Sequence, residues 1–126
     1  MVDPSRKMMM TSRLEHYESK YRSLVSELQG LGFISQGSVV LRRTSCNKPG
    51  CKCTGDPPRL HGPYYQWTRK VSGKTVGRQL TEAEADLYRE WINNRRELQR
   101  ILGEMETTSA KAGEILLRQA KSAARQ

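Results

Sequence analysis

Aromatic residues are scarce in this chain of 126 residues, which holds one Phe, two Trp and five Tyr. Hydrophobic residues make up 36% of the sequence and charged residues 28%. Typical globular domains are about 45–50% apolar, so this composition predicts a small core. The length suits one domain, or a small core with helical extensions.

Long apolar stretches and paired cysteines are also missing. No run of 18 apolar residues is present, so we expect no membrane span, and the N-terminal segment lacks the apolar stretch of a secretory signal. Three cysteines are an odd number, which disfavours a closed set of disulfides. The expectation is a cytoplasmic protein with no membrane partner.

Several enzyme signatures are absent as well. The sequence holds no P-loop GxxxxGK[ST], no HExxH and no GxSxG. Asp56 is the single acid between residues 37 and 80, so a carboxylate pair for two-metal nuclease chemistry would need acids from distant helices. We therefore expect no enzymatic activity.

Positive charge is what the chain has in excess. It carries 22 Lys/Arg and 13 Asp/Glu, for a net charge of +9. Residues 37–80 hold nine of these basic residues against Asp56 alone. Charge of one sign confined to one module favours a polyanionic partner, nucleic acid above all. An acidic protein, an anionic lipid surface and a plain solubilising surface remain open.

The N-terminal third predicts one helix. We expect residues 1–10 to be a disordered N-terminus and residues 11–36 to form an N-terminal helical segment that ends near Gly30. A helix packed on its own domain and a coiled-coil seam fit the apolar spacing of three and four equally well. The apolar positions are Leu14, Tyr17, Tyr21, Leu24, Leu28 and Leu31.

The basic module at residues 37–80 predicts three short strands. β-branched and aromatic residues place them at 37–43, 63–71 and 74–80, with an irregular loop over 44–62. Ser72-Gly73 supplies a two-residue hairpin turn.

The C-terminal third again predicts helix. Thr81 and Glu84 form a capping box that opens a long helix within residues 81–105. We expect Gly103 and the run Thr107–Ser109 to break it and residues 106–126 to form a helical or partly disordered tail. The expected buried stripe is Tyr88, Trp91, Arg95, Leu98, Leu102 and Met105.

The cysteines gather in the loop as C-x4-C-x-C-x7-H. Cys46, Cys51, Cys53 and His61 offer three thiolates and one imidazole, a donor set that zinc prefers in tetrahedral sites. Four protein ligands leave no open position, so the zinc (Zn²⁺) would be structural. An iron–sulfur cluster, a redox site and three free thiols remain as alternatives. The predicted fold class is α+β: a three-stranded antiparallel sheet with a zinc-stabilised Cys/His loop, flanked by an N-terminal helix and a long C-terminal helix with a helical tail.

This cysteine cluster also carries a resemblance. Residues 37–100 resemble a small family of uncharacterised prokaryotic and phage proteins, a domain of unknown function. The resemblance implies that the cysteines and His61 act as one motif, and it suggests a setting near mobile elements. The matching residues are Gly37-Ser38-Val39, Arg43, Cys46, Lys48 to Cys53, His61 to Tyr65, Gly73 to Val76, Arg78 and Leu80.

The expected function is nucleic-acid binding by an accessory or regulatory protein, possible roles being transcription regulation, recombination and packaging. Double-stranded DNA is the first choice, with RNA and single strands left open, because a β-ribbon fits the major groove. The alternative is an adaptor that docks on a recombinase, transposase or phage component through its helices. Their apolar stripes also suggest a homodimer. The residues expected to bind nucleic acid are Arg42, Arg43, Lys48, Lys52, Arg59, Gln66, Thr68, Arg69, Lys70, Lys74 and Arg78.

Overall fold

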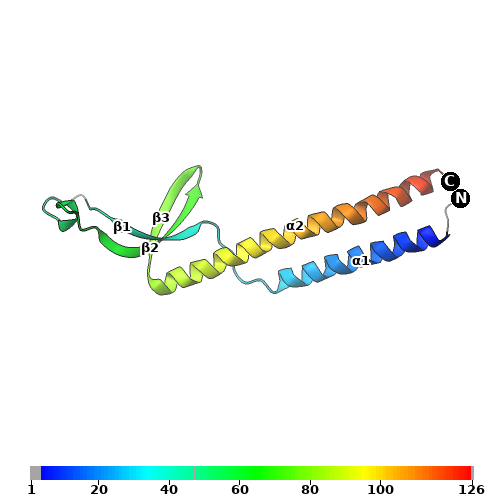
Figure 1. Cartoon of the computed structure of the whole chain (residues 1–126), viewed down its shortest axis with the longest axis horizontal. Coiled ribbons are helices and arrows are strands. Elements are labelled where there is room, and N and C mark those ends of the chain that lie inside the picture. Colours follow the sequence, from blue (N-terminus) through cyan, green and yellow to red (C-terminus); the bar gives the residue numbers. More distant parts are fainter. Residues whose placement is uncertain (1–3, 47, 126) are drawn as a thin grey trace. The chain divides into compact units, whose positions relative to one another are not determined.

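The computed structural model describes residues 4–46 and 48–125 and confirms the predicted fold class (Figure 1). A three-stranded antiparallel sheet lies in the chain between an N-terminal helix and a long C-terminal helix. No helix in the described part combines the length and apolarity needed to cross a membrane. The elements in order are α1 (Pro4–Gln29), β1 (Ser38–Thr44), the 3-10 helix η1 (Lys52–Thr54), β2 (His61–Val71), β3 (Lys74–Leu80) and α2 (Glu82–Ala124).

The chain forms two compact units, and α2 contributes to both. The sheet unit comprises residues 32–95, with all three strands and the first part of α2. The helical unit comprises the residues up to Leu31 and those from Arg96 on, so α1 pairs with the remainder of α2.

In the helical unit, α1 and the second part of α2 lie antiparallel (Figure 1). They pack on each other through one apolar stripe from each helix. Leu24 of α1 and Ile101 and Ile115 of α2 are buried, and Arg100 reaches across to Glu27 at 3.6 Å. The stripe predicted in α1 therefore faces α2 of the same chain. The prediction that Leu102 of α2 is buried is wrong: its side chain is 44% exposed, whereas the neighbouring Ile101 is 2% exposed.

Both helices are longer than predicted. Residues 4–10 are helical rather than disordered, while residues 1–3 of the predicted disordered segment lie outside the described residues. The predicted break near Gly103 does not occur, because α2 is continuous to Ala124. The Thr107 hydroxyl donates a hydrogen bond to the Gly103 carbonyl oxygen at 3.0 Å, and Thr108 is 3% exposed within the hairpin. Burial against α1 thus outweighs the low helix propensity of these residues.

The strands are ordered β1-β2-β3, with both neighbouring pairs antiparallel. Residues 72 and 73 form the predicted hairpin turn, with φ of 51° at Ser72 and 79° at Gly73. Two successive positive φ angles are the signature of the turn type that matches strand twist. The third strand occupies the predicted residues 74–80, and the other two differ from prediction by one or two residues at an end.

One face of the sheet, here called the inner face, packs on α2. The Trp67 ring stacks on Tyr88 with ring centroids 4.3 Å apart, and Arg89 lies 4.9 Å from the centroid of the Tyr65 ring. Leu80 is buried where β3 ends, and Ala85 is buried in the first turns of α2. The alternation of side chains along β2 and β3 thus turns these aromatic residues towards α2.

The capping box at the start of α2 is confirmed in both directions. The Glu84 amide donates to the Thr81 hydroxyl at 3.2 Å, and the Thr81 amide donates to the Glu84 carboxylate at 3.0 Å. These hydrogen bonds from Thr81, together with the charge of Arg78, lower the pKa of the Glu84 carboxyl. The reciprocal bonds fix the point at which the chain leaves the sheet and enters α2.

Candidate metal centre

The loop between β1 and β2 is built from short hydrogen-bonded turns. The Cys51 amide donates to the Lys48 carbonyl at 3.4 Å across Pro49 and Gly50, and Gly50 has φ of 78°. Proline followed by a residue of positive φ is typical of a type II turn. The 3-10 helix η1 follows directly, and the Thr54 amide donates a hydrogen bond to the Cys51 carbonyl oxygen at 3.1 Å. This geometry returns Cys51 and Cys53 towards Cys46.

The loop gathers the four predicted ligands into one cluster. The Sγ atoms of Cys46, Cys51 and Cys53 and a ring nitrogen of His61 all lie within 4.8 Å of one another. Cys46 Sγ is 3.4 Å from Cys53 Sγ, and His61 Nε2 is 3.3 Å from Cys46 Sγ and 3.2 Å from Cys51 Sγ. Tetrahedral zinc holds sulfur atoms about 3.8 Å apart, and sulfur and nitrogen about 3.5 Å apart. The four donor atoms therefore form a possible metal-binding site.

The electrostatics of the cluster differ from one thiol to the next. The Lys48 backbone amide, followed by His61 and the neighbouring thiols, lowers the pKa of the Cys46 thiol from 9.0 to about 6. The Cys46 backbone amide donates to Cys53 Sγ at 3.2 Å and lowers its pKa, but burial and the neighbouring sulfur atoms outweigh this, and the pKa of Cys53 is raised. Backbone amides that donate to sulfur would help to stabilise a site rich in thiolates.

Gly62 fixes the backbone beside His61, the candidate histidine ligand. His61 pairs with Thr44 at an irregularity of the β1–β2 ladder, and Gly62 follows with φ of 109°. A Cβ atom at Gly62 would lie 2.7 Å from the Arg42 carbonyl oxygen. Only glycine fits this close approach of the two strands. Sequence reasoning did not assign Gly62 a role, although its place directly after a ligand was a usable signal.

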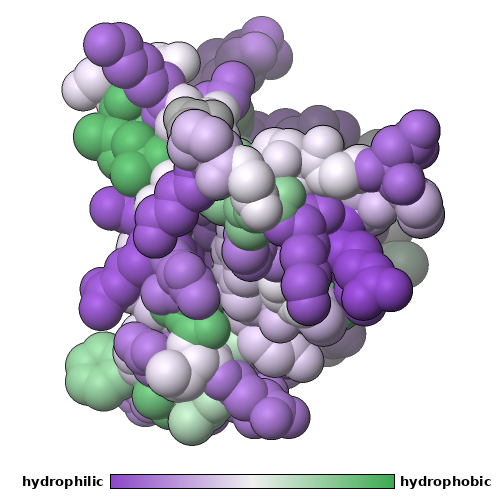
Figure 2. All heavy atoms as spheres, turned by 90° about the vertical axis from the view of Figure 1, so that its left-hand side faces the viewer, coloured by the Kyte–Doolittle hydropathy of each residue, from purple (hydrophilic) through white to green (hydrophobic). Residues whose placement is uncertain are grey.

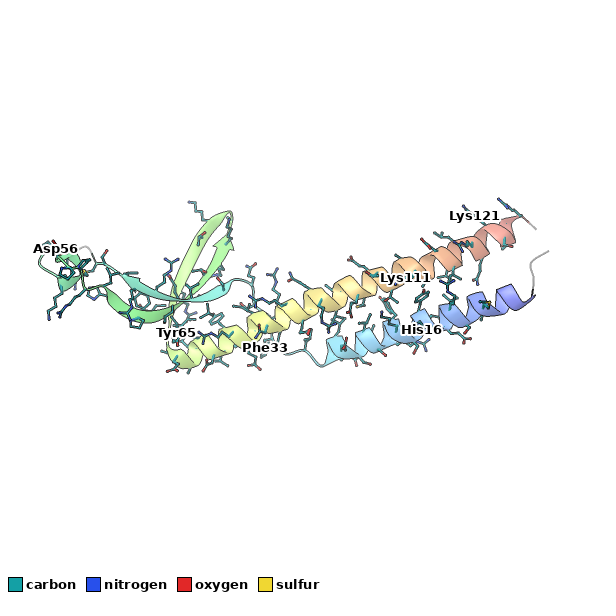
Figure 3. The ribbon with its side chains drawn as sticks, viewed as in Figure 1. His16, Phe33, Asp56, Tyr65, Lys111 and Lys121 are labelled. Atoms are coloured by element: carbon teal, nitrogen blue, oxygen red, sulfur yellow. The ribbon has the colours of Figure 1, made fainter. Side chains whose placement is uncertain are left out.

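The residues predicted to bind nucleic acid fall into four groups. Arg43, Lys48, Lys52 and Arg59 are exposed on or beside the loop, where Asp56 is the one acid (Figure 3). Lys74 begins β3 at the hairpin turn. The other groups lie on the two faces of the sheet.

The face opposite α2, here called the outer face, carries four predicted residues. Ladder pairing and strand alternation place Arg42, Gln66, Thr68 and Lys70 on this face. Thr68 and Ser38 share a hydrogen bond at 3.0 Å. The Gln66 side-chain amide lies over Gly77, and a Cβ atom at position 77 would collide with it.

Two predicted residues, Arg69 and Arg78, lie instead on the inner face. The Arg69 guanidinium is 4.0 Å from the centroid of the Trp67 ring, and Arg78 pairs with Glu84 at 3.8 Å. The aromatic residues Tyr65 and Trp67 belong to this face too, so they support the sheet on α2. The period-two alternation of β2 and β3 separates these two arginines from Lys70.

A known family accounts for much of the chain. The family described as "Domain of unknown function (DUF6788)" matches residues 14–90. The chain belongs to the DUF6788 family. The DUF6788 match starts earlier than the resemblance expected from residue 37, so it takes in most of α1 as well as the sheet and the metal cluster. Neither a search of curated proteins nor one of solved structures finds a match.

Proposed function

We propose that this DUF6788 protein is a double-stranded DNA-binding accessory or regulatory protein whose basic sheet module is braced by a structural zinc ion. The observation that carries the proposal is the separation of charge in the sheet unit. Residues 37–80 hold nine Lys/Arg and one acid, whereas all four acids of residues 81–95 stand in α2. Seen from the end that bears the Cys/His loop, hydrophilic side chains project over most of the surface (Figure 2).

Zinc is the metal that the donor set favours. Three thiolates and one imidazole suit zinc, whereas hard cations such as Mg²⁺ and Ca²⁺ prefer oxygen ligands. Four protein donors complete a tetrahedral shell and leave no position for a substrate, which supports a structural role and no catalytic one. Zinc bound there would tie the end of β1 to the start of β2 and aim Lys48 and Lys52.

The outer face supplies the groups that would meet DNA. Its described hydrogen bonds and close contacts stay within the sheet, and Lys70 and Thr75 are exposed side by side in the β2–β3 ladder. Polar side chains on a β-ribbon can contact base edges in the major groove, while lysines and arginines hold phosphates. Arg69 and Arg78 support the sheet instead, so we assign the phosphate contacts to the outer face and the loop.

The salt dependence of binding tests the proposal. If the zinc-loaded protein neutralises about six phosphates, log K for duplex DNA should fall with log salt with a slope near −5. A slope near zero would contradict the electrostatic basis of binding. Comparing duplex DNA, single-stranded DNA and RNA of one sequence decides the class of nucleic acid.

Two double variants of equal charge make the test local. Replacing Lys52 and Lys70 by alanine should reduce the slope by about two, because each phosphate contact contributes about 0.9. Replacing Lys111 and Lys121 by alanine removes the same charge from α2 in the helical unit (Figure 3) and should leave the slope unchanged. Equal effects of the two double variants would mean that only net charge matters.

A protein-interaction adaptor is the second candidate, favoured by one feature of the helical unit. An open groove of about 410 Å³ lies between α1 and α2, lined in part by Tyr17, Tyr21, Ala112 and Leu116. Such a groove could accept an apolar segment of a recombinase, transposase or phage component, in the mobile-element setting of prokaryotes or phages that we propose. An adaptor should keep its activity in the Lys52/Lys70 double variant and lose it when Leu116 is replaced by glutamate.

A further inference from the structure

The rarest side chains of the chain gather at one place in the sheet unit. The single Phe, both Trp and one of the five Tyr line an open groove of about 420 Å³, together with Ile34 and Ser35. Tyr88 stands at the centre, stacked on Trp67 at 4.3 Å and in edge contact with Trp91 at 5.0 Å. Phe33 meets only the edge of the Trp91 ring, with centroids 6.5 Å apart.

Phe33 projects from a segment whose backbone is held in place. The Asn94 side-chain amide donates to the Phe33 carbonyl at 2.8 Å, and the Ser35 amide donates to the Trp91 carbonyl at 3.1 Å. The Trp67 indole N–H donates to the Gln36 carbonyl at 2.9 Å. The Phe33 side chain is nevertheless 82% exposed. An apolar side chain that a fixed backbone presents to solvent is pre-organised for docking, since little conformational freedom is left to lose.

We infer that this aromatic groove is the interface between two copies of the chain. A projecting side chain and a groove that can receive an aromatic ring lie next to each other on the same surface. A two-fold interface requires such self-complementarity, because each copy must supply both parts. In the dimer, Phe33 of each copy would enter the groove of the other and contact Trp67, Tyr88 and Trp91.

The charge distribution favours a second copy at this surface. Two copies repel each other through residues 37–80, which hold nine basic residues and one acid. The groove wall formed by Tyr88 and Trp91 belongs to residues 81–95, which hold four acids and two arginines. The Trp67 wall belongs to the basic residues and carries Arg69, 4.0 Å from its ring centroid. A two-fold axis along the groove would therefore set the acidic wall of one copy against the basic wall of the other. The apolar stripes of α1 and α2 suggested a dimer from the sequence, but in the structure they pack on each other within one chain.

Sedimentation velocity on the full, zinc-loaded chain tests the inference, with intrinsic fluorescence as a second measurement. We expect a concentration-dependent monomer–dimer equilibrium. Because the chain's only tryptophans both line the groove, their emission should shift to shorter wavelength as the dimer forms. Phe33→Ala should raise the dimer dissociation constant at least about tenfold, as expected for a central aromatic anchor.

A matched control separates this surface from any other apolar contact. Leu117 is 66% exposed and lies on α2 in the helical unit, so Leu117→Ala should leave the dimer unchanged. Circular dichroism should show both variants folded, because each alters an exposed side chain. A protein that stays monomeric at hundreds of micromolar, or a dimer that Phe33→Ala does not weaken, would overturn the inference. A dimer lost on Leu116→Ala but not on Phe33→Ala would move the interface to the helical groove. None of these outcomes depends on DNA binding.

Discussion

If the Cys/His cluster binds a metal as proposed, its removal by a chelator should release the Cys/His loop while the rest of the sheet unit stays folded. Of the described loop residues, only Cys53 is buried, so apolar burial contributes little to the order of this segment. The contacts between the inner face and α2, such as Trp67 on Tyr88, involve no loop residue. In the proposed zinc-loaded protein, metal ligation would therefore be the main interaction that holds the loop in one conformation.

The size of the effect follows from the length of the segment that the metal closes. The ligands Cys46 and His61 enclose 16 residues. A cross-link around a loop of about 15 residues removes about 3 kcal/mol of conformational entropy from the open state. At 1.4 kcal/mol for each factor of ten, this corresponds to about 100-fold in the opening equilibrium. Loop amides should lose about two orders of magnitude of exchange protection on chelation.

Hydrogen exchange followed by NMR measures this loss at single amides. The donors to watch are those of Cys46, Cys51, Thr54, Gly55 and Arg59, each hydrogen-bonded within the loop.

The control amides are those of the β2–β3 ladder, for example around the pair Arg69 and Val76, which should keep their protection. Adding zinc back should restore the loop. Unchanged protection of the loop amides after complete chelation would refute the reasoning, since the hydrogen-bonded turns would then suffice. Loss of protection throughout the sheet would show that the metal supports the whole unit.

Three further predictions address particular residues. In urea unfolding, Ile101→Ala should destabilise the helical unit by about 3 kcal/mol. Leu102→Ala should change the stability of this unit by less than about 0.5 kcal/mol. Equal effects of the two substitutions would contradict the packing of α2. Gly62→Ala should weaken metal binding at least about tenfold, because it forces a Cβ atom into the backbone of β1. Gly50→Ala adds its Cβ atom in open space and should weaken binding less. If a competitive chelator titration shows that the two variants bind metal equally, this role of Gly62 is contradicted. In the closed loop the Lys48 amide and His61 lower the pKa of the Cys46 thiol to about 6, so release of the loop by chelation should return this pKa towards 9.0. Alkylation of Cys46 by iodoacetamide in the metal-free protein, followed by mass spectrometry, should therefore rise with pH to a midpoint well above 6; a midpoint near 6 would show that the loop keeps its conformation without metal.

Local patterns predicted most of the elements correctly. The capping box of Thr81 and Glu84 and the turn at Ser72-Gly73 each depend on residues that are neighbours in the chain. The four metal donors also lie within 16 consecutive residues, and the turn at Pro49-Gly50 brings them together with little help from elsewhere. Local steric and hydrogen-bonding rules act at this range, so the cluster could be predicted from spacing alone.

Local patterns failed where packing competes with propensity. Gly103 and the threonines after it predicted a break in α2, but Thr108 is buried against the rest of the hairpin and the helix continues. Similarly, a spacing argument chose Leu102 for the buried stripe in place of Ile101. Burial along the whole length of a partner helix is worth more than the small differences in propensity between single residues.

The sequence by itself determined the order of helices and strands, the basic character of residues 37–80 and the set of four candidate metal donors, because each depends on residues close together in the chain. Only the tertiary structure decided that the two apolar stripes pair within one chain and that Phe33 stands beside Trp67 and Trp91. These contacts join residues far apart in the sequence. They depend on strand register and on the face that each helix turns to its neighbour, which no local spacing encodes.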